Sequence, residues 1–433
     1  MKIAVIGSGI SGMATSWLLS QKYEVDCYEK NSYIGGHSNT VDVDYDGSKI
    51  AVDTGFIVFN KYNYPNLVKL FDHLGVEYLP SKMSFSCSLN NGNFEYAGTD
   101  FKGLFACKKN ILNPYFYRML YDIVRFNKIA KKMLKDDSIE ENQTIGSFVF
   151  QHKFSKYFTK YYLMAMASAI WSCNPSDSML QPAKNFIKFF HNHNLLETNN
   201  HHQWYTVKNG SREYVKKIIS SCNAKFLVNH NVISVDSTFN KVQIRFSVDN
   251  KELIADYDKV IFANHSNEIS EISSLCNADL SLVMESFQFQ KNLAILHCDQ
   301  EIMPKSKKVW ASWNFTAHKN SQENEEEKNS YNLKNTSFTY WMNNLQNIDK
   351  KYPLFVTLNP LKTIDEKKIF AKFEYSHPLY NVNSFDFHRK IATIQGKNNM
   401  YFCGAYLGYG FHEDGLLSAI NVAKMFDVSP PWQ

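Results

Sequence analysis

The chain has 433 residues, which is longer than a domain with a single hydrophobic core usually is, so we expect two domains. Hydrophobic residues at 44% and charged residues at 21% exclude a disordered chain, and a formal net charge of +5 is too small to indicate nucleic acid as a partner. The eight cysteines form no CxxC pair, and no His-rich metal spacing is present, which predicts reduced thiols in a cytoplasmic protein without a metal site.

The N-terminal segment KIAVIGSGISGMATSWLLSQKYEVDCYEK, residues 2–30, predicts a strand, a glycine turn, a helix and a second strand. In a dinucleotide site Gly7 permits the tight turn, Gly9 lets the backbone approach the pyrophosphate, and Gly12 allows close helix–strand packing. The helix N-terminus presents N–H groups to phosphate, and Glu29 can accept hydrogen bonds from ribose hydroxyls. We therefore predict a dinucleotide site that includes Gly7, Ser8, Gly9, Ile10, Ser11, Gly12, Glu29 and Lys30.

Two following segments indicate which dinucleotide is bound: NSYIGGHSNTV comes directly after Lys30, and VDTGFIVFN lies a little further on. Together they resemble cofactor-binding segments of FAD enzymes of the amine oxidase and phytoene desaturase superfamily. Those enzymes usually have Arg after the paired glycines, where this chain has His37. The resemblance implies FAD as the cofactor and adds to its site Gly35, Gly36, His37, Asp53, Thr54 and Gly55. The chain has no second GxGxxG motif, hence no evident separate NAD(P) site.

Residues 102–135 carry nine basic residues and one acidic residue, Asp122. On a helix that begins at Pro114, basic and apolar side chains fall on opposite faces, the basic ones being Arg118, Arg125, Lys128, Lys132 and Lys135 and the apolar ones Phe116, Leu120, Ile123 and Ala130. Such a helix can rest on an anionic phospholipid surface, which would make the protein peripheral on the inner face of the cytoplasmic membrane. A solvated basic face over packed apolar residues is the alternative. The sequence contains no run of about twenty apolar residues, so we expect no membrane-spanning helix.

The middle of the chain continues the predicted FAD domain. The segment NGSREYV (209–215) predicts a helix, AKFLVNHNVISVD (224–236) predicts paired short strands, and DKVIFANHS (258–266) predicts a buried strand. In the superfamily, the position of Val232 contacts adenine through its backbone, and Ala263 follows a strand of the flavin domain. Further on, TYWMNNLQ (339–346) combines bulky aromatic residues with a few polar groups, which is typical of an apolar pocket, although core packing explains each aromatic residue equally well.

The segment MYFCGAYLGYGFHEDGLLSAI (400–420) predicts a strand over 401–403, a glycine-rich loop and a helix from Asp414. In the superfamily this last strand and helix close the flavin site, and N–H groups of the helix face the flavin N1–C2=O edge, where negative charge gathers on reduction. The resemblance adds to the FAD site Gly404, Glu413, Asp414, Gly415 and Leu416, although Ala405 stands where many relatives have an acid. Helix capping is an alternative role for both carboxylates.

Three residues are candidate catalytic groups. His412 beside an isoalloxazine ring could orient substrate or move protons, and a packed, hydrogen-bonded histidine is the alternative. Tyr340 or Tyr409 could lie over the flavin ring. The sequence does not identify a catalytic base, and His412 is the first choice for that role.

Several further segments resemble bacterial FAD proteins that are encoded beside cyclopropane-fatty-acid-synthase-like methyltransferases. They include AIWSCNPSDSMLQPAKNFIKFFHNHNLL (169–196), WYTVKNGSREYV (204–215) and GYGFHEDGLLSA (408–419), and the resemblance covers nearly the whole chain. One branch of that group is implicated in furan fatty acid synthesis, where a flavoprotein desaturates a methyl-branched acyl chain. The resemblance implies a phospholipid or fatty acyl substrate and a functional link to a lipid methyltransferase.

These observations predict an α/β fold with an α+β substrate part: a Rossmann-type FAD-binding domain (1–70, 200–268 and 395–433) and a discontinuous, amine-oxidase-like substrate domain (71–199 and 269–394). We expect an FAD-dependent desaturase of methyl-branched unsaturated acyl chains, with hydride transfer to flavin N5 and reoxidation by oxygen or a quinone. The alternatives are an amine oxidase for a soluble amine, an acyl isomerase without net redox change, and a non-catalytic flavoprotein partner of the methyltransferase. A homodimer is possible.

Overall fold

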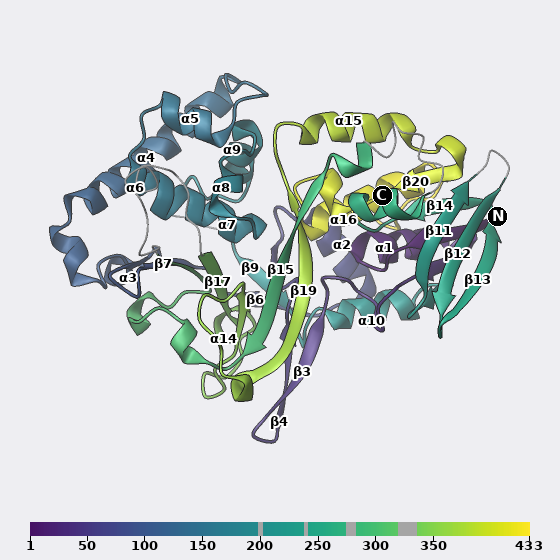
Figure 1. Ribbon diagram of the computed structural model, residues 1–433, viewed down its shortest axis with the longest axis horizontal. Helices are drawn as coiled ribbons and strands as arrows, with labels where there is room; N and C mark the ends of the chain where they lie inside the picture. Colours follow the sequence, from purple (N-terminus) through teal and green to yellow (C-terminus); the bar gives the residue numbers. More distant parts are fainter. Residues whose placement is uncertain (198–201, 238–240, 274–282, 319–335) are drawn as a thin grey trace.

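The computed structural model describes residues 1–197, 202–237, 241–273, 283–318 and 336–433. Figure 1 shows a sheet with its helices at the end that carries both termini, a helical lobe at the opposite end, and a large antiparallel sheet between them. The α/β fold with an amine-oxidase-like arrangement is the fold predicted from the sequence. The division of the chain at residues 70, 200, 268 and 395 stays a prediction.

A five-stranded parallel sheet forms the centre of the first part, in the order β10-β2-β1-β14-β20. Its strands are β1 (Lys2–Ile6), β2 (Glu24–Tyr28), β10 (Lys225–Leu227), β14 (Lys259–Phe262) and β20 (Met400–Phe402). Because side chains alternate along a strand, Ile3 and Val5 join one core cluster while Ala4 and Ile6 join another. The helices that contribute to the cluster of Ile3 and Val5 are α1 (Ile10–Leu19), α2 (Pro65–Leu74), α10 (Arg212–Ser220) and α16 (His412–Lys424).

A three-stranded antiparallel sheet supplies residues to the other cluster, with Val235, Val242 and Ile244 buried in it. Its strands are β11 (Asn231–Ser237), β12 (Val242–Val248) and β13 (Lys251–Tyr257). The sequence predicted that the short strands within 224–236 pair with each other, and this is wrong. β10 pairs with β2 and β11 pairs with β12, because the turn between them passes from one sheet to the next.

The substrate half contains a seven-stranded sheet in the order β19-β15-β18-β17-β16-β7-β8, in which only the pair β16 and β7 is parallel. Its strands are β7 (Phe85–Leu89), β8 (Phe94–Ala97), β15 (Gln288–His297), β16 (Trp313–Ala317), β17 (Thr336–Trp341), β18 (Phe355–Leu358) and β19 (Ile369–Leu379). Two small sheets connect the halves: β3 (Thr40–Tyr45) with β4 (Ser48–Asp53), and β5 (Phe59–Asn60) with β9 (Trp204–Val207) and β6 (Tyr78–Ser81).

The helical lobe lies at the left of Figure 1. Its helices are α3 (Phe101–Leu104), α4 (Pro114–Lys135), α5 (Ile145–Gln151), α6 (Lys156–Phe158), α7 (Met164–Trp171), α8 (Pro175–Ser178) and α9 (Ala183–Asn192). Among the described residues, the other α-helices are α11 (Ser266–Ile272), α14 (Met342–Leu345) and α15 (Ser384–Ile394). The predicted start of α4 at Pro114 is confirmed, and the Asn113 side chain accepts a hydrogen bond from the Tyr115 N–H there.

Part of the basic face predicted for α4 is already paired within the protein and is not free to bind an external partner. Arg118 and Arg125 both form ion pairs with Asp122, which is fully buried, and Arg125 also donates to the His152 carbonyl. A buried carboxylate needs such partners because an unpaired buried charge is costly. No helix within the described part of the chain has the length and apolar character to cross a membrane.

Candidate functional site

The glycine turn between β1 and α1 is shaped by close backbone contacts at two of its three glycines. Gly7 has φ of +97°, and a Cβ there would lie 3.1 Å from the carbonyl group of Ala263. A Cβ on Gly12 would lie 1.8 Å from the Gly7 carbonyl oxygen, so α1 can pack this closely only without a side chain. By contrast, a Cβ on Gly9 would meet nothing within 4 Å. The turn therefore leaves open space over Gly9, at the N-terminus of α1, where a phosphate group can approach.

Glu29 lies at the end of β2 and is buried beside this turn. Its Oε2 atom accepts hydrogen bonds from the Ser8 N–H at 3.1 Å and the Ser8 hydroxyl at 2.6 Å. Its Oε1 atom accepts from the backbone and side-chain amides of Asn31, each at 2.9 Å. The neighbouring Lys30 pairs with Glu268 at 2.8 Å. The turn thus fixes a carboxylate at the place where a ribose diol lies in dinucleotide sites.

One cavity of about 1930 Å³ runs from this turn into the substrate half. Pockets for a single small ligand usually measure about 300–1,000 Å³, so this one has room for a cofactor and a substrate. Most residues that the sequence assigned to the site line it: Gly7, Ser8, Gly9, Ile10, Ser11, Glu29, Lys30, Gly36, His37, Thr54, Gly55, Val232, Ala263, Tyr340, Gly404 and His412. The other assigned residues lie outside its lining: Gly12, Gly35, Asp53, Tyr409, Glu413, Asp414, Gly415 and Leu416.

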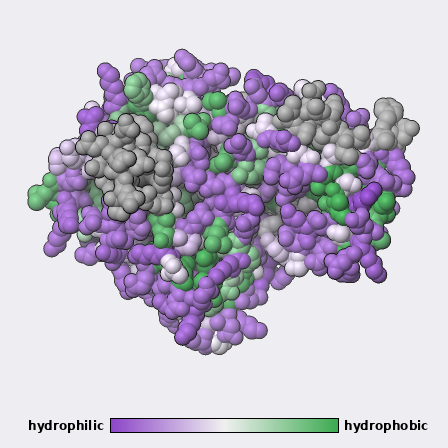
Figure 2. All heavy atoms as spheres, in the orientation of Figure 1, coloured by the Kyte–Doolittle hydropathy of each residue, from purple (hydrophilic) through white to green (hydrophobic). Residues whose placement is uncertain are grey.

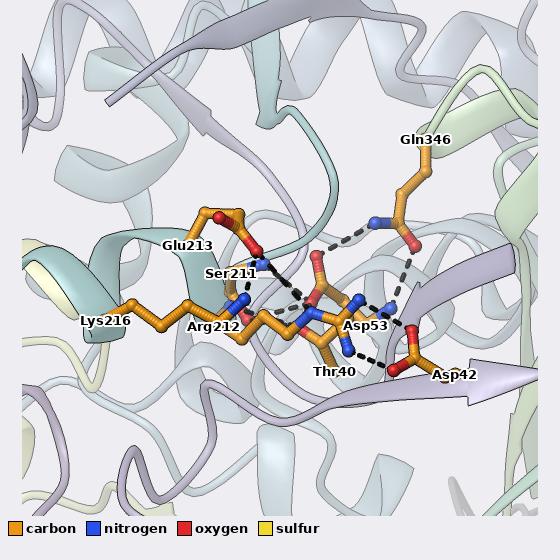
Figure 3. Close-up of polar contacts among 8 residues, drawn as sticks. All are labelled: Thr40, Asp42, Asp53, Ser211, Arg212, Glu213, Lys216 and Gln346. Carbon is orange, nitrogen blue, oxygen red and sulfur yellow. Dashed lines mark hydrogen bonds and ion pairs between the residues drawn. The ribbon is translucent and has the colours of Figure 1, made fainter. Parts of the chain in front are cut away.

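Asp53 is a structural carboxylate, and its predicted direct contact with a cofactor is not supported by its position (Figure 3). Oδ1 accepts from the Thr40 hydroxyl at 2.6 Å and from the backbone N–H and hydroxyl of Ser211, both at 2.8 Å. Oδ2 accepts from the Gln346 side chain at 2.9 Å, and the Asp53 N–H donates back to Gln346. Burial raises the Asp53 pKa to about 6. The residue therefore ties β4 to α10 and to the substrate half.

Glu413 and Asp414 cap helices, which is the alternative role considered for them. Glu413 accepts hydrogen bonds from the N–H groups of Asn66 and Leu67 at 3.0 and 2.9 Å, at the start of α2. Asp414 accepts from the Phe411 N–H at 2.9 Å and thereby closes the first turn of its own helix. Because of this capping, α16 begins at His412, two residues before the predicted start at Asp414.

His412 lies in the cavity wall as a positioned, neutral imidazole. Its ring stacks on Phe56 with centroids 3.7 Å apart, and Nε2 lies 2.9 Å from the Ser38 hydroxyl and 3.2 Å from the Tyr214 hydroxyl. Burial lowers its pKa to about 3. A general base works best with a pKa near the working pH, so this environment favours an orienting role over proton removal.

His37 presents an unsatisfied nitrogen at the cavity. Its Nε2 atom is buried and has no hydrogen-bond partner among the described residues. The ring stacks on Tyr375 at 4.8 Å and meets His377 edge-on at 5.2 Å. Burial, followed by the nearby His377 and His265, holds the His37 pKa well below its usual value. A buried polar atom without a partner is unusual in a folded protein and is a mark of a ligand site.

Sequence reasoning did not identify Tyr375, His377 and His265 as site residues. All three line the cavity, and Tyr375 lies 2.7 Å from the Thr54 hydroxyl through its own hydroxyl. Two of them come from β19, which no local motif connects with the glycine turn. Their alternation along that strand, Tyr375 and His377 facing the same side, is the only signal that the sequence offers.

The cavity continues into a part that we call the apolar arm. It is lined by Met83, Phe85, Tyr96, Leu104, Leu120, Ile123, Tyr162, Met166, Ile170, Trp313, Tyr340 and Leu358. Within residues 83–172, all of which are described, no lining residue is charged. Tyr340 packs edge-on against Trp313 at 5.6 Å, and burial raises the Tyr340 pKa to about 12. Asn127 is a polar exception, because it is 7% exposed and its Oδ1 atom has no described partner.

We expect the flavin-free protein to lose stability as the pH falls from 7 to 5. Burial lowers the pKa of His193 and of His297 to about 4, so both stay neutral in the folded chain while the unfolded chain binds protons below about pH 6.5. The stability that these two histidines contribute is therefore fully present above pH 6.5. It is lost on acidification, by about 2 kcal/mol per histidine at pH 5. The raised Asp53 pKa of about 6 acts in the opposite direction and offsets part of this loss.

Urea unfolding at pH 7 and pH 5 measures this effect. The variant His297→Gln should show a smaller pH-dependent loss, because its side chain cannot bind the proton that the unfolded wild-type chain takes up. Equal stability at the two pH values, or greater stability at pH 5, would contradict the expectation.

Comparison with known proteins agrees with the first part of the fold. A family model described as an NAD(P)-binding Rossmann-like domain matches residues 5–74. The chloroplastic/chromoplastic zeta-carotene desaturase of Solanum lycopersicum is 40% identical over 78 residues, which are 18% of this chain and 13% of that protein. The zeta-carotene desaturase of Synechocystis is 32% identical over 117 residues, 27% of this chain and 23% of that protein. The chain thus matches less than a quarter of the length of these curated relatives.

Solved structures resemble the fold over almost the full chain. The CLA-producing fatty acid isomerase from P. acnes has a TM-score of 0.66 at 12% identity, with 98% of both chains covered. Cyclohexylamine oxidase from Brevibacterium oxydans has a TM-score of 0.64 at 12% identity, with 98% of this chain and 99% of that chain covered. The predicted amine-oxidase-like α/β fold is therefore confirmed.

Proposed function

We propose that this protein is an FAD-dependent oxidoreductase that dehydrogenates a long acyl chain. The finer part of the proposal is a methyl-branched, unsaturated acyl chain of a phospholipid, as in furan or methylated fatty acid synthesis. One observation carries the proposal: a single cavity joins a dinucleotide-binding turn to an arm whose lining residues between 83 and 172 are uncharged. An arm lined by uncharged residues favours a hydrocarbon chain over a charged substrate.

The residues around the glycine turn fit FAD. Gly9 has open space where a pyrophosphate can approach, Glu29 supplies a carboxylate for a ribose, and Val232 lines the same cavity. The unpaired Nε2 atom of His37 is a further polar contact for a bound group. Bound FAD would accept a hydride from a C–H bond of the substrate, while the adjacent carbon loses a proton and a double bond forms.

The chain's own residues supply position and dryness. The arm holds an acyl chain away from water, and Tyr340 and Trp313 form part of its wall. His412, fixed between Ser38 and Phe56, orients groups at the inner end of the cavity without carrying charge. Asn127 is a polar side chain of the arm whose Oδ1 atom has no described partner and can accept a hydrogen bond from a hydroxyl group of the substrate.

Two other reactions are possible on this fold. The likeness to a fatty acid isomerase supports an acyl isomerase, which would move a double bond without net oxidation. The likeness to cyclohexylamine oxidase supports an amine oxidase. We favour an acyl substrate for this chain because the lining from 83 to 172 contains no charged residue, whereas the carboxylates that line the cavity, Glu29, Glu197, Glu268, Glu271 and Glu374, lie outside that range.

Anaerobic mixing of the flavin-bound protein with a methyl-branched unsaturated phospholipid tests the proposal. We expect the flavin absorbance to bleach and a new diene to form in the extracted lipid. A shifted double bond without bleaching or oxidant consumption would identify an isomerase, and bleaching by cyclohexylamine alone would identify an amine oxidase. The flavin spectrum could also stay unchanged with both compounds, with neither a diene nor a shifted double bond in the lipid, while dithionite still reduces the flavin. That result would rule out catalysis on these substrates and favour a non-catalytic partner of the methyltransferase.

The variant Ile123→Trp places a larger side chain in the apolar arm, and Leu180→Trp places the same side chain at an exposed position of the helical lobe. We expect Ile123→Trp to slow flavin reduction by the lipid about a hundredfold while it retains the flavin, because a substrate displaced by about 1 Å reacts that much more slowly. Leu180→Trp should reduce at the wild-type rate. Equal rates for both variants would show that the arm does not hold the substrate.

A further inference from the structure

The outer surface of the segment from α3 to α4 carries large apolar side chains in solvent. Phe101 is 82% exposed and Leu112 is 88% exposed, and five further residues are also exposed. We call this set the apolar ridge, and it consists of Phe101, Ile111, Leu112, Tyr115, Tyr117, Tyr121 and Val124. In Figure 2 hydrophobic atoms project at the left edge of the molecule, at the end where Figure 1 places this segment. Contiguous exposed apolar residues of this size mark an interaction site more often than single exposed residues do.

Lysines flank the apolar ridge at both ends. Lys102, Lys108 and Lys109 lie beside Phe101 and Leu112 in sequence, while Lys128, Lys132 and Lys135 continue α4 beyond Val124. None of these six lysines forms an ion pair with a described residue. The one acidic residue between 101 and 135 is Asp122, which is buried and held by Arg118 and Arg125. The surface therefore combines exposed rings with positive charge that nothing described on the same helix neutralises.

The two faces of α4 have separate roles. At 3.6 residues per turn, the outward residues Tyr117, Tyr121, Val124 and Lys128 fall within an arc of about 60°. Leu120 and Ile123, which lie about 70° and about 130° around the helix from the centre of that arc, line the apolar arm. Since Leu104 of α3 lines the arm as well, α3 and α4 contribute residues both to the apolar ridge and to the lining of the arm.

We propose that the apolar ridge and its six lysines dock this protein on the surface of an anionic phospholipid bilayer. Tyrosine and phenylalanine rings settle at the boundary between headgroups and acyl chains, and lysine ammonium groups lie among lipid phosphates. A protein partner would fit this surface less well, because protein interfaces are depleted in lysine. This proposal does not depend on the reaction proposed above, because binding to vesicles is measured without any substrate turnover.

Vesicle flotation with the flavin-bound protein tests this proposal. We expect the protein to float with vesicles of phosphatidylglycerol and phosphatidylcholine, to stay at the bottom with phosphatidylcholine alone, and to be released by high salt, which screens the lysines. The pair Lys108→Glu and Lys109→Glu should weaken binding about fivefold or more per lysine. The pair Phe101→Ser and Leu112→Ser should weaken it about tenfold at unchanged charge.

Matched substitutions on β13, at the opposite end of the molecule in Figure 1, serve as controls. Ile254 and Lys251 are both exposed there, so Ile254→Ser and Lys251→Glu should leave vesicle binding unchanged. Failure of the wild-type protein to bind anionic vesicles would overturn the proposal. So would an equal loss of binding in the ridge variants and in the β13 variants, or binding to anionic vesicles that no ridge substitution weakens.

Discussion

Replacing Gly9 with valine should give a folded protein that no longer retains flavin. Gly9 has φ of −66° and ψ of −176°, which a valine adopts without strain, and a Cβ there meets nothing within 4 Å. The valine side chain would instead occupy the space at the start of α1 through which a pyrophosphate approaches. We expect a loss of flavin affinity of about a hundredfold or more, equivalent to about 3 kcal/mol. The measurement is the ratio of flavin to protein absorbance after purification.

Two comparisons separate this effect from damage to the fold. Gly98→Val also adds a side chain at the cavity, where the nearest atom to a new Cβ is the Phe85 carbonyl oxygen at 3.9 Å, and it should retain flavin. Gly12→Ala should destabilise the protein itself, because its Cβ would lie 1.8 Å from the Gly7 carbonyl oxygen. If Gly9→Val purifies with as much flavin as the wild type, the glycine turn is not the cofactor site.

Replacing Asp53 with leucine should lower the free energy of unfolding by about 3–5 kcal/mol. The substitution leaves the Ser211 N–H and the hydroxyls of Thr40 and Ser211 without their acceptor, and it removes the contact with Gln346 (Figure 3). Asp53→Asn keeps one acceptor oxygen and should cost less. Urea unfolding of the flavin-free proteins measures both changes.

The exposed end of the same network provides the control. Asp42 pairs with Arg212 at 2.5 Å near the surface, so Asp42→Asn should change stability little, as is usual for solvent-exposed ion pairs. If Asp53→Leu and Asp42→Asn unfold at the same urea concentration, the buried carboxylate does not hold the two halves together.

The cofactor-binding turn could be predicted from the sequence because its parts are adjacent in the chain. Strand β2 runs from Glu24 to Tyr28, inside the segment predicted to contain the second strand, and Glu29 follows it directly. Every requirement of that site, from the tight turn to the helix N-terminus, is met within one stretch of about thirty residues. Local propensity and tertiary structure agree there.

The carboxylates of Asp53 and Glu413, which the sequence assigned to the cofactor site, have protein partners that the sequence does not show. Glu413 is adjacent to His412 in sequence, but its carboxylate binds N–H groups of α2, which lies far earlier in the chain. Asp53 is likewise used by Ser211 and Gln346. A carboxylate beside a glycine-rich loop can serve a ligand or an orphan helix N-terminus, and only the tertiary contacts decide between them.

The order of strands in the parallel sheet has a consequence for biosynthesis. Strand β1 is central and β2 follows it directly, but β14 and β20 come much later, and β20 is made almost 400 residues after β1. At about 5–20 residues per second, a ribosome needs roughly 20–80 s to reach β20 and α16. The nascent turn lacks β14, which pairs with β1, until residue 262 is made, and it lacks α16 until the end of that time. We therefore expect the complete site to form only after β20 and α16 have been translated.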